Sequence, residues 1–159
     1  MKSKKLIYTI ITILWIAVIF GFSLQPATVS NNVSGSILTR ILAPMFPQIM
    51  ENKELAHLAH LFVRKAAHFT EYMVLGMLSV NAIQYYLTKK LYVMSAGFCV
   101  VIAMIDETIQ LFVPGRDGRF WDVLIDSSGA IVGIVLFMLF TYLFKKNHIT
   151  PNNSEKIIK

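Results

Sequence analysis

The apolar segments of this chain are long enough to enter a membrane, and this feature most limits what the chain can fold into. The first segment, Leu6–Leu24, has no charged side chain and follows Lys2, Lys4 and Lys5. A helix needs about 20 predominantly apolar residues to cross the hydrocarbon core of a bilayer. Because Pro26 lies where a signal peptide would be cleaved, we expect an uncleaved first span.

The composition agrees with a membrane protein. Hydrophobic residues make up 55% of the 159 residues and charged residues only 15%, so a soluble domain of this size could not bury its apolar surface. The net charge of +6 comes largely from lysines at the ends of apolar segments, and we expect no nucleic-acid partner.

The later apolar segments reach spanning length only by including charged residues. Tyr72–Leu87 and Leu91–Ile105 are each short, so their helices must take in the polar turns beside them. The pattern predicts an all-α membrane protein with four transmembrane helices in a small bundle and one domain, residues 1–159. The expected spans are residues 6–25, 64–87, 91–113 and 120–144, followed by a polar tail, residues 145–159.

Lysine pairs beside the spans predict the orientation. Lys4-Lys5, Lys89-Lys90 and Lys145-Lys146 lie on one side of a four-span arrangement, and cytoplasmic loops are enriched in lysine and arginine. We therefore expect cytoplasmic N- and C-termini, with inverted insertion as the alternative. The loop between the first two spans would be extracellular and contain short interfacial helices, as the spacing of Ile37, Leu38, Ile41 and Leu42 indicates.

Three acidic residues on separate predicted spans fall at one depth. At about 1.5 Å per residue, Glu71, Asp106 and Asp126 each lie about 10–12 Å from the outer end of their helix. Ionisable groups at this depth cost roughly 2.5–3.5 kcal/mol each, so they usually have a partner or a function. Gly129 and Gly133 share a face with the aspartates of the last span, which favours close approach of another helix there.

These residues define a candidate site facing the extracellular side. His68 with Glu71 is the candidate acid–base pair, because imidazole titrates near neutrality and a carboxylate can orient it. Asp106 and Glu107 complete the candidate catalytic set. The candidate ligand-binding residues are Gln25, Arg64, Lys65, Tyr72, Gln110, Arg116, Arg119, Asp122 and Asp126.

Two other interpretations of the same charges stay open. The carboxylates could pair with Arg64, Arg116 and Arg119 and simply lock the bundle. Alternatively, a divalent metal could bind, with ligands drawn from His68, Glu71, Asp106 and Asp126, because histidine and carboxylate spaced three residues apart on a helix can share an ion. No cofactor motif is evident.

The charged runs resemble those of the VanZ-like membrane proteins. The resemblance rests on residues 64–72 followed by Leu75-Gly76, on residues 106–116 followed by Asp122, Asp126 and Gly129, and on residues 22–26 with Ser30 and Ser34. Leu24 departs from the pattern, since many relatives have a second serine there. The resemblance covers residues of about 6 to 144 and implies a helical bundle. The family is named for a protein associated with low-level teicoplanin resistance, and no reaction is firmly attached to it.

Together these features predict a multi-pass protein of the plasma membrane and cell envelope. An outward-facing polar cavity would bind, and in an enzymatic version modify, an envelope lipid or a lipid-linked wall precursor, in connection with glycopeptide resistance. The alternatives are a proton-coupled transporter or flippase and a non-enzymatic structural or shielding protein. The bilayer is the expected partner, and a homo-oligomer is compatible with the sequence.

Overall fold

The computed structural model describes residues 2–87 and 89–147 of the chain. Four long helices make up most of it: α1 (Lys2–Ser23), α5 (Lys53–Ile83), α6 (Leu91–Gln110) and α7 (Phe120–Asn147). Between α1 and α5 lie α2 (Ala27–Ile37), a π-helical turn (Leu38–Leu42), α3 (Ala43–Met45) and α4 (Gln48–Glu51). The described residues contain no strand, which confirms the predicted all-α class. The predicted tail begins as the last turn of α7, and residues 148–159 lie outside the described part.

Three helices have the length and composition to cross a membrane: α1, α6 and α7 over Phe120–Phe144. Their outer surfaces are apolar, with Leu14 60% and Phe140 59% exposed. The longer α5 does not meet the same condition over the described residues, because the charged turns from Arg64 to Glu71 interrupt its apolar sequence. A fourth span within α5 therefore stays a prediction, as does the orientation of the bundle.

Local sequence signals explain where the helices start and stop. The side chain of Asn52 caps α5 by accepting hydrogen bonds from the backbone of Glu54 at 2.9 Å and Leu55 at 3.3 Å. From there α5 runs without a break through the amphipathic segment into the predicted second span. α6 ends at Gln110, four residues before Pro114, which cannot continue a helix.

Glycines allow α5 and α7 to cross at close range. A Cβ atom at Gly129 would overlap the backbone of Phe69, and one at Gly133 would overlap that of Met73. On the α5 side, Gly76 lies equally close to the backbone of Ala130. The small residues of α7 therefore contact a neighbouring helix as predicted, and α5 is that helix.

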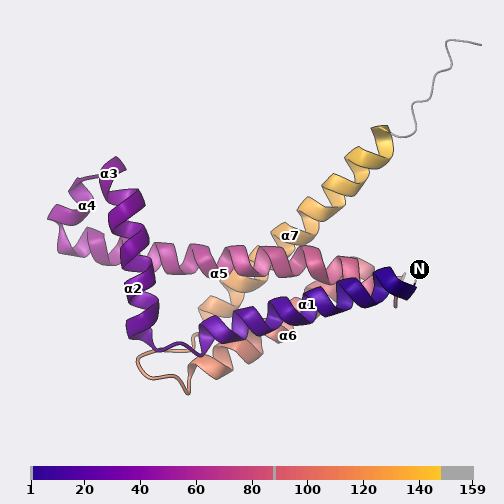
Figure 1. Cartoon of the computed structure of the whole chain (residues 1–159), viewed down its shortest axis with the longest axis horizontal. Coiled ribbons are helices and arrows are strands. Elements are labelled where there is room, and N and C mark those ends of the chain that lie inside the picture. Colours follow the sequence, from indigo (N-terminus) through magenta and orange to yellow (C-terminus); the bar gives the residue numbers. More distant parts are fainter. Residues whose placement is uncertain (1, 88, 148–159) are drawn as a thin grey trace, which may run out of the picture.

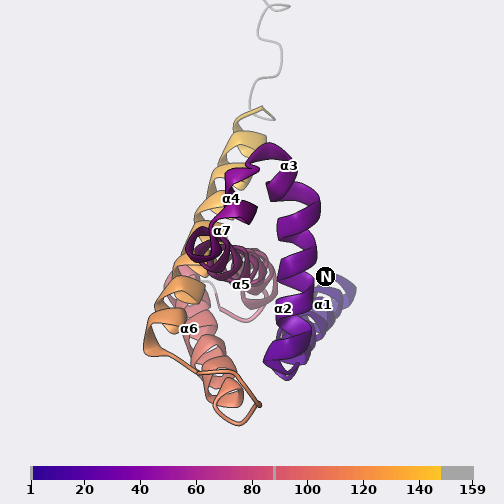
Figure 2. The same ribbon diagram turned by 90° about the vertical axis from the view of Figure 1, so that its left-hand side faces the viewer.

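The polar ends of the long helices gather at one end of the bundle. Figure 1 shows the C-terminal ends of α1 and α6, the start of α7 and the first half of α5 on the same side, with α2 steeply inclined to α1, α5 and α6. Figure 2 looks along α5 and shows it between α2 and α7. The buried core includes Ile19, Tyr72, Leu75, Cys99, Ala103 and Ala130.

Candidate functional site

Four elements bring their polar side chains together at this end of the bundle. α5 contributes Arg64, Lys65, His68, Glu71 and Tyr72, and α6 contributes Asp106, Glu107 and Gln110. The loop between α6 and α7 adds Arg116 and Arg119, and α7 adds Asp122 and Asp126. The hydrogen bonds and ion pairs within this group join segments far apart in the chain.

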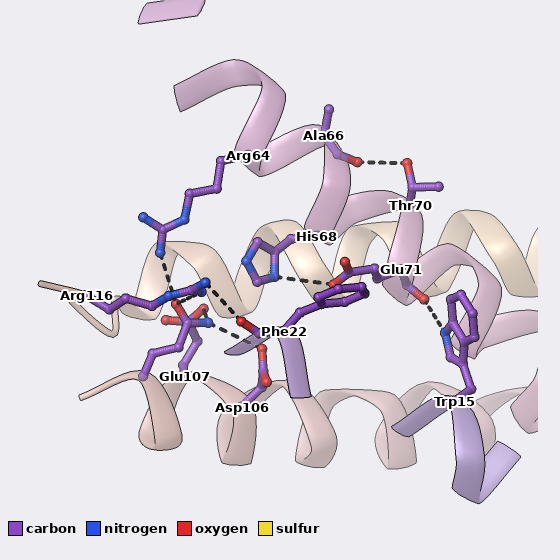
Figure 3. Close-up of polar contacts among 11 residues, drawn as sticks. Trp15, Phe22, Arg64, Ala66, His68, Thr70, Glu71, Asp106, Glu107 and Arg116 are labelled. Carbon is purple, nitrogen blue, oxygen red and sulfur yellow. Dashed lines mark hydrogen bonds and ion pairs between the residues drawn. The ribbon is translucent and has the colours of Figure 1, made fainter. Parts of the chain in front are cut away.

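Gln110 connects the basic groups to the acidic ones. Its side-chain oxygen accepts hydrogen bonds from Arg64 at 3.3 Å and from Arg116 at 3.4 Å. Its amide nitrogen donates to Asp106 Oδ2 at 3.4 Å and to Glu107 Oε1 at 3.1 Å. One neutral amide thus lies between two guanidinium groups and two carboxylates, and Figure 3 shows Arg64 and Arg116 converging beside Glu107.

Arg116 also fastens the loop to the end of α1. Its Nε donates to the backbone oxygen of Gln25 at 2.8 Å and its Nη2 to that of Phe22 at 3.0 Å. Burial lowers the pKa of Arg116 from its ordinary value, and the positive charge of Arg64 acts in the same direction. Gln25 therefore contributes its backbone oxygen to the site, and the residue also lines a cavity there.

Glu107, one turn before Gln110 on α6, holds the residues that lead into α7. Glu107 Oε2 accepts a hydrogen bond from the backbone N–H of Arg119 at 2.8 Å. Gly118 passes so close to the backbone of Glu107 that a Cβ atom would not fit there. Both carboxylate oxygens of Glu107 therefore accept hydrogen bonds from neighbouring residues of the protein.

A second group of side chains is buried without hydrogen-bond partners. His68 Nδ1 lies 3.9 Å from Glu71 Oε2, too far for a hydrogen bond. Asp106 Oδ1 and both carboxylate oxygens of Asp126 are buried and have no partner in the described part of the chain, and the same holds for the hydroxyl of Tyr72. Asp106 is 0% and Asp126 1% exposed. Such groups ordinarily bind something, because an unsatisfied buried polar atom costs about 1–3 kcal/mol.

Two ion pairs lie at the edge of the site. Lys65 pairs with Asp122, and both are partly exposed. The guanidinium of Arg119 pairs with Asp117 at 3.2 Å on the surface. Arg119 therefore holds no carboxylate of the helices through its side chain.

The alternative that arginines pair with the carboxylates of the helices gains no support from this arrangement. Within the described residues, no ion pair joins Arg64 or Arg116 to an acidic side chain, since both guanidinium groups bind oxygen atoms of amides. The sequence predicts that these charges share a depth, but it does not predict which partner each one takes.

Two cavities open beside the polar group, and Arg64 and His68 line both. The first holds about 600 Å³ of empty space, part of it open to solvent, between α5, α7 and the loop, where Gln110, Asp122 and Asp126 also line it. The second, of about 620 Å³, lies between α1, α2 and α5. Its polar lining includes Gln25, Glu71 and Arg116, and its apolar wall includes Phe22, Val33, Ile37 and Val63.

Sequence reasoning assigns no part of the site to α2, yet this helix forms one wall of the second cavity. Ser30 and Ser34 both face it, and Ser34 Oγ lies 3.2 Å from His60 Nδ1 of α5. The four-residue spacing of the two serines places them on one helical face and is the signal that could have pointed to this wall.

Comparison with known proteins agrees with this picture at the level of the family. The model of the VanZ/LLP1 family matches residues 8–141, which include every polar residue of the site. The chain belongs to the VanZ/LLP1 family. No curated protein and no solved structure matches it. Membership in the VanZ/LLP1 family, together with three apolar helices of spanning length, supports a membrane protein.

Proposed function

We propose that this VanZ/LLP1 protein binds the anionic headgroup of an envelope lipid, or of a lipid-linked wall intermediate, at the extracellular face of the plasma membrane. The bound headgroup would lie beside Arg64 and Arg116, with the rest of the lipid along the apolar wall of the second cavity. The connection with teicoplanin-type resistance, implied by the family, belongs to this proposal.

The observation that carries the proposal is the convergence of two guanidinium groups on one amide oxygen. Arg64 and Arg116 share Gln110 Oε1 and neither is paired with a carboxylate in the described residues. Two like charges held together favour an anion between them, and arginine suits phosphate because its planar fork can donate two parallel hydrogen bonds.

The shape of the second cavity supports an amphipathic ligand. Polar side chains from α5 and the loop face apolar ones from α1 and α2, among them Phe22, Val33 and Ile37. Ligand cavities in proteins commonly combine an apolar lining with a few placed polar groups. The positive-inside pattern of the lysines supports an outward opening of this end of the bundle.

Any chemistry on the bound headgroup would use His68 and Glu71. His68 lines both cavities and Glu71 lines the second one, so both can reach a ligand there. Glu71 at 3.9 Å from Nδ1 could orient the imidazole after a small movement.

Lipid binding to the purified chain tests the proposal. Native mass spectrometry of the detergent-solubilised protein would compare phosphatidylglycerol with phosphatidylcholine for the wild type, Arg64→Gln and Arg40→Gln. Arg64→Gln removes a charged donor worth about 1.5–3 kcal/mol, so we expect phosphatidylglycerol affinity to fall by about 10–100-fold. Arg40 is exposed on the turn after α2 and lines neither cavity described above, so Arg40→Gln should behave as the wild type.

Equal phosphatidylglycerol binding by Arg64→Gln and the wild type would overturn the proposal. The cellular readout follows the same variants: a strain that expresses Arg64→Gln should tolerate less teicoplanin than one that expresses Arg40→Gln. If lipid binding is lost and tolerance is unchanged, the binding site stands and its link with resistance does not.

A further inference from the structure

We propose that His68, Asp106 and Asp126 form a binding site for one first-row divalent metal ion, such as Zn²⁺ or Mn²⁺. Each of the three residues offers one ligand atom, and these atoms all lie within 4.8 Å of one another. They come from α5, α6 and α7, so an ion at this point would join three helices.

The unsatisfied state of the aspartates is an independent observation that points to a ligand. Asp126 is 1% exposed, and neither of its carboxylate oxygens has a hydrogen-bond partner in the described part of the chain. Asp106 is 0% exposed and one of its oxygens is likewise unpartnered. Two buried carboxylates this close repel each other, and a divalent cation removes both the repulsion and the lack of partners.

The spacing of the ligand atoms fits an ion after a small contraction. Zinc binds nitrogen and oxygen ligands at about 2.0–2.2 Å, so two ligands of one tetrahedral ion lie about 3.3–3.6 Å apart. The three ligand atoms already lie within 4.8 Å of one another, so an ion would draw them closer together.

The donor set and its surroundings suit a transition metal. One imidazole with two carboxylates offers mixed nitrogen and oxygen ligands, which zinc and manganese accept. Metal-binding histidines commonly have a carboxylate nearby that orients the ring, and Glu71 Oε2 lies 3.9 Å from His68 Nδ1. His68 and Asp126 both line the first cavity, which provides an entry path.

Equilibrium dialysis of the full-length protein against Zn²⁺ tests the site. The protein would be purified without a polyhistidine tag, treated with chelator and placed in phosphatidylcholine nanodiscs, and bound zinc would be measured by mass spectrometry of the metal. We expect one Zn²⁺ per chain in the wild type. Asp126→Asn keeps the shape of the side chain and removes its charge. Changing a residue that only surrounds a bound metal typically lowers metal affinity by about 10–100-fold, so changing a ligand should weaken Zn²⁺ binding at least tenfold.

Matched substitutions outside the cluster separate the site from surface binding. Asp117→Asn changes an exposed aspartate that pairs with Arg119, and His57→Gln changes an exposed histidine of α5. Both should retain the wild-type zinc content, whereas His68→Gln should lose it. Co²⁺ binding gives a second readout, because visible absorption bands report nitrogen and oxygen ligation directly and should change in His68→Gln.

Two results would overturn this inference. One is a folded wild-type protein that binds no Zn²⁺ above the level of the buffer, and the other is unaltered binding in both Asp126→Asn and His68→Gln. If Asp126→Asn does not fold, His68→Gln alone decides, since its side chain is partly exposed in the cavity and is easier to replace. The nanodiscs contain only neutral lipid, so the result does not depend on whether the cavity binds an anionic headgroup.

Discussion

Gln110 shows how one uncharged side chain can organise a charged site. It is 2% exposed and uses its oxygen for two arginines and its nitrogen for two carboxylates. A carboxylate at this position would neutralise the arginines, and a basic group would neutralise the acids. The amide does neither. The guanidinium groups of Arg64 and Arg116 therefore keep their positive charge beside the second cavity, which both residues line.

Replacing Gln110 with an apolar side chain of similar length should therefore destabilise the protein. Gln110→Met leaves Glu107 Oε1 and one donor of Arg64 without their partners, and we expect a loss of about 1–3 kcal/mol in the free energy of unfolding. Unfolding in mixed micelles of dodecyl maltoside and sodium dodecyl sulfate measures it. Gln84→Met is the matched control, because within the described part of the chain the Gln84 amide donates only to Asn81, three residues earlier. Equal stability of the two variants would contradict the role of Gln110.

The proximity of the candidate site residues followed from the sequence, whereas their pairing did not. Periodicity and depth brought His68, Asp106 and Asp126 together in the prediction, and the structure places their ligand atoms within 4.8 Å of one another. Hydrogen-bond partners depend on side-chain rotamers and on the path of the loop, so nothing in the spacing of Arg116 indicates that it binds the backbone of Phe22.

At the scale of elements, the crossing of α5 and α7 fixes the position of the acidic residues. Gly129 and Gly133 remove the side chains that would separate the two helices, and Asp126 lies one turn before Gly129 on the same side. Close packing of backbones therefore holds Asp126 among its neighbours, and the site depends on residues that carry no functional group.

A methyl group at this crossing should be costly. Gly129→Ala places its Cβ against the backbone of Phe69, which cannot rotate away, and overpacking of this kind costs about 1–3 kcal/mol. Gly97→Ala on α6 is the control, since nothing lies within 4 Å of the added atom. Thermal unfolding followed by size-exclusion chromatography should show a lower transition temperature for Gly129→Ala and an unchanged or higher one for Gly97→Ala. The same transition temperature for both would mean that the crossing is looser than described.

The sequence predicts the long helices better than the short ones. α1, α6 and α7 follow from long, mostly apolar sequence and from Pro114, and all three lie close to their predicted limits. α2 contains Asn31, Asn32 and Gly35, which are poor helix formers, and its position depends on contacts with α5 such as Ser34 with His60. Tertiary contacts of this kind leave little trace in local sequence.

For the whole molecule, the distribution of lysines predicts that the polar end of the bundle lies outside the cell. The turn that contains Lys89 and Lys90 lies at the other end of α5 and α6 (Figure 1), so the two ends can be probed separately. Lys89 and Asp117 are exposed, and the single native cysteine, Cys99, is buried.

Cysteine labelling of intact cells should confirm this orientation. In a Cys99→Ala background, a membrane-impermeant maleimide should label Asp117→Cys in intact cells and Lys89→Cys only after permeabilisation. The reverse pattern would show inverted insertion and place the cavity on the cytoplasmic side. Labelling of both positions in intact cells would contradict a span between them, and therefore the crossing of the membrane by α6.

The hydrogen bonds of Arg116 have a consequence for biosynthesis. The oxygen atom of Phe22 that Arg116 binds belongs to a residue 94 positions earlier in the chain. The end of the first helix is therefore completed only when the last hairpin emerges from the ribosome. A nascent chain that ends before Arg116 therefore lacks the donors that this arginine supplies to the backbone oxygens of Phe22 and Gln25.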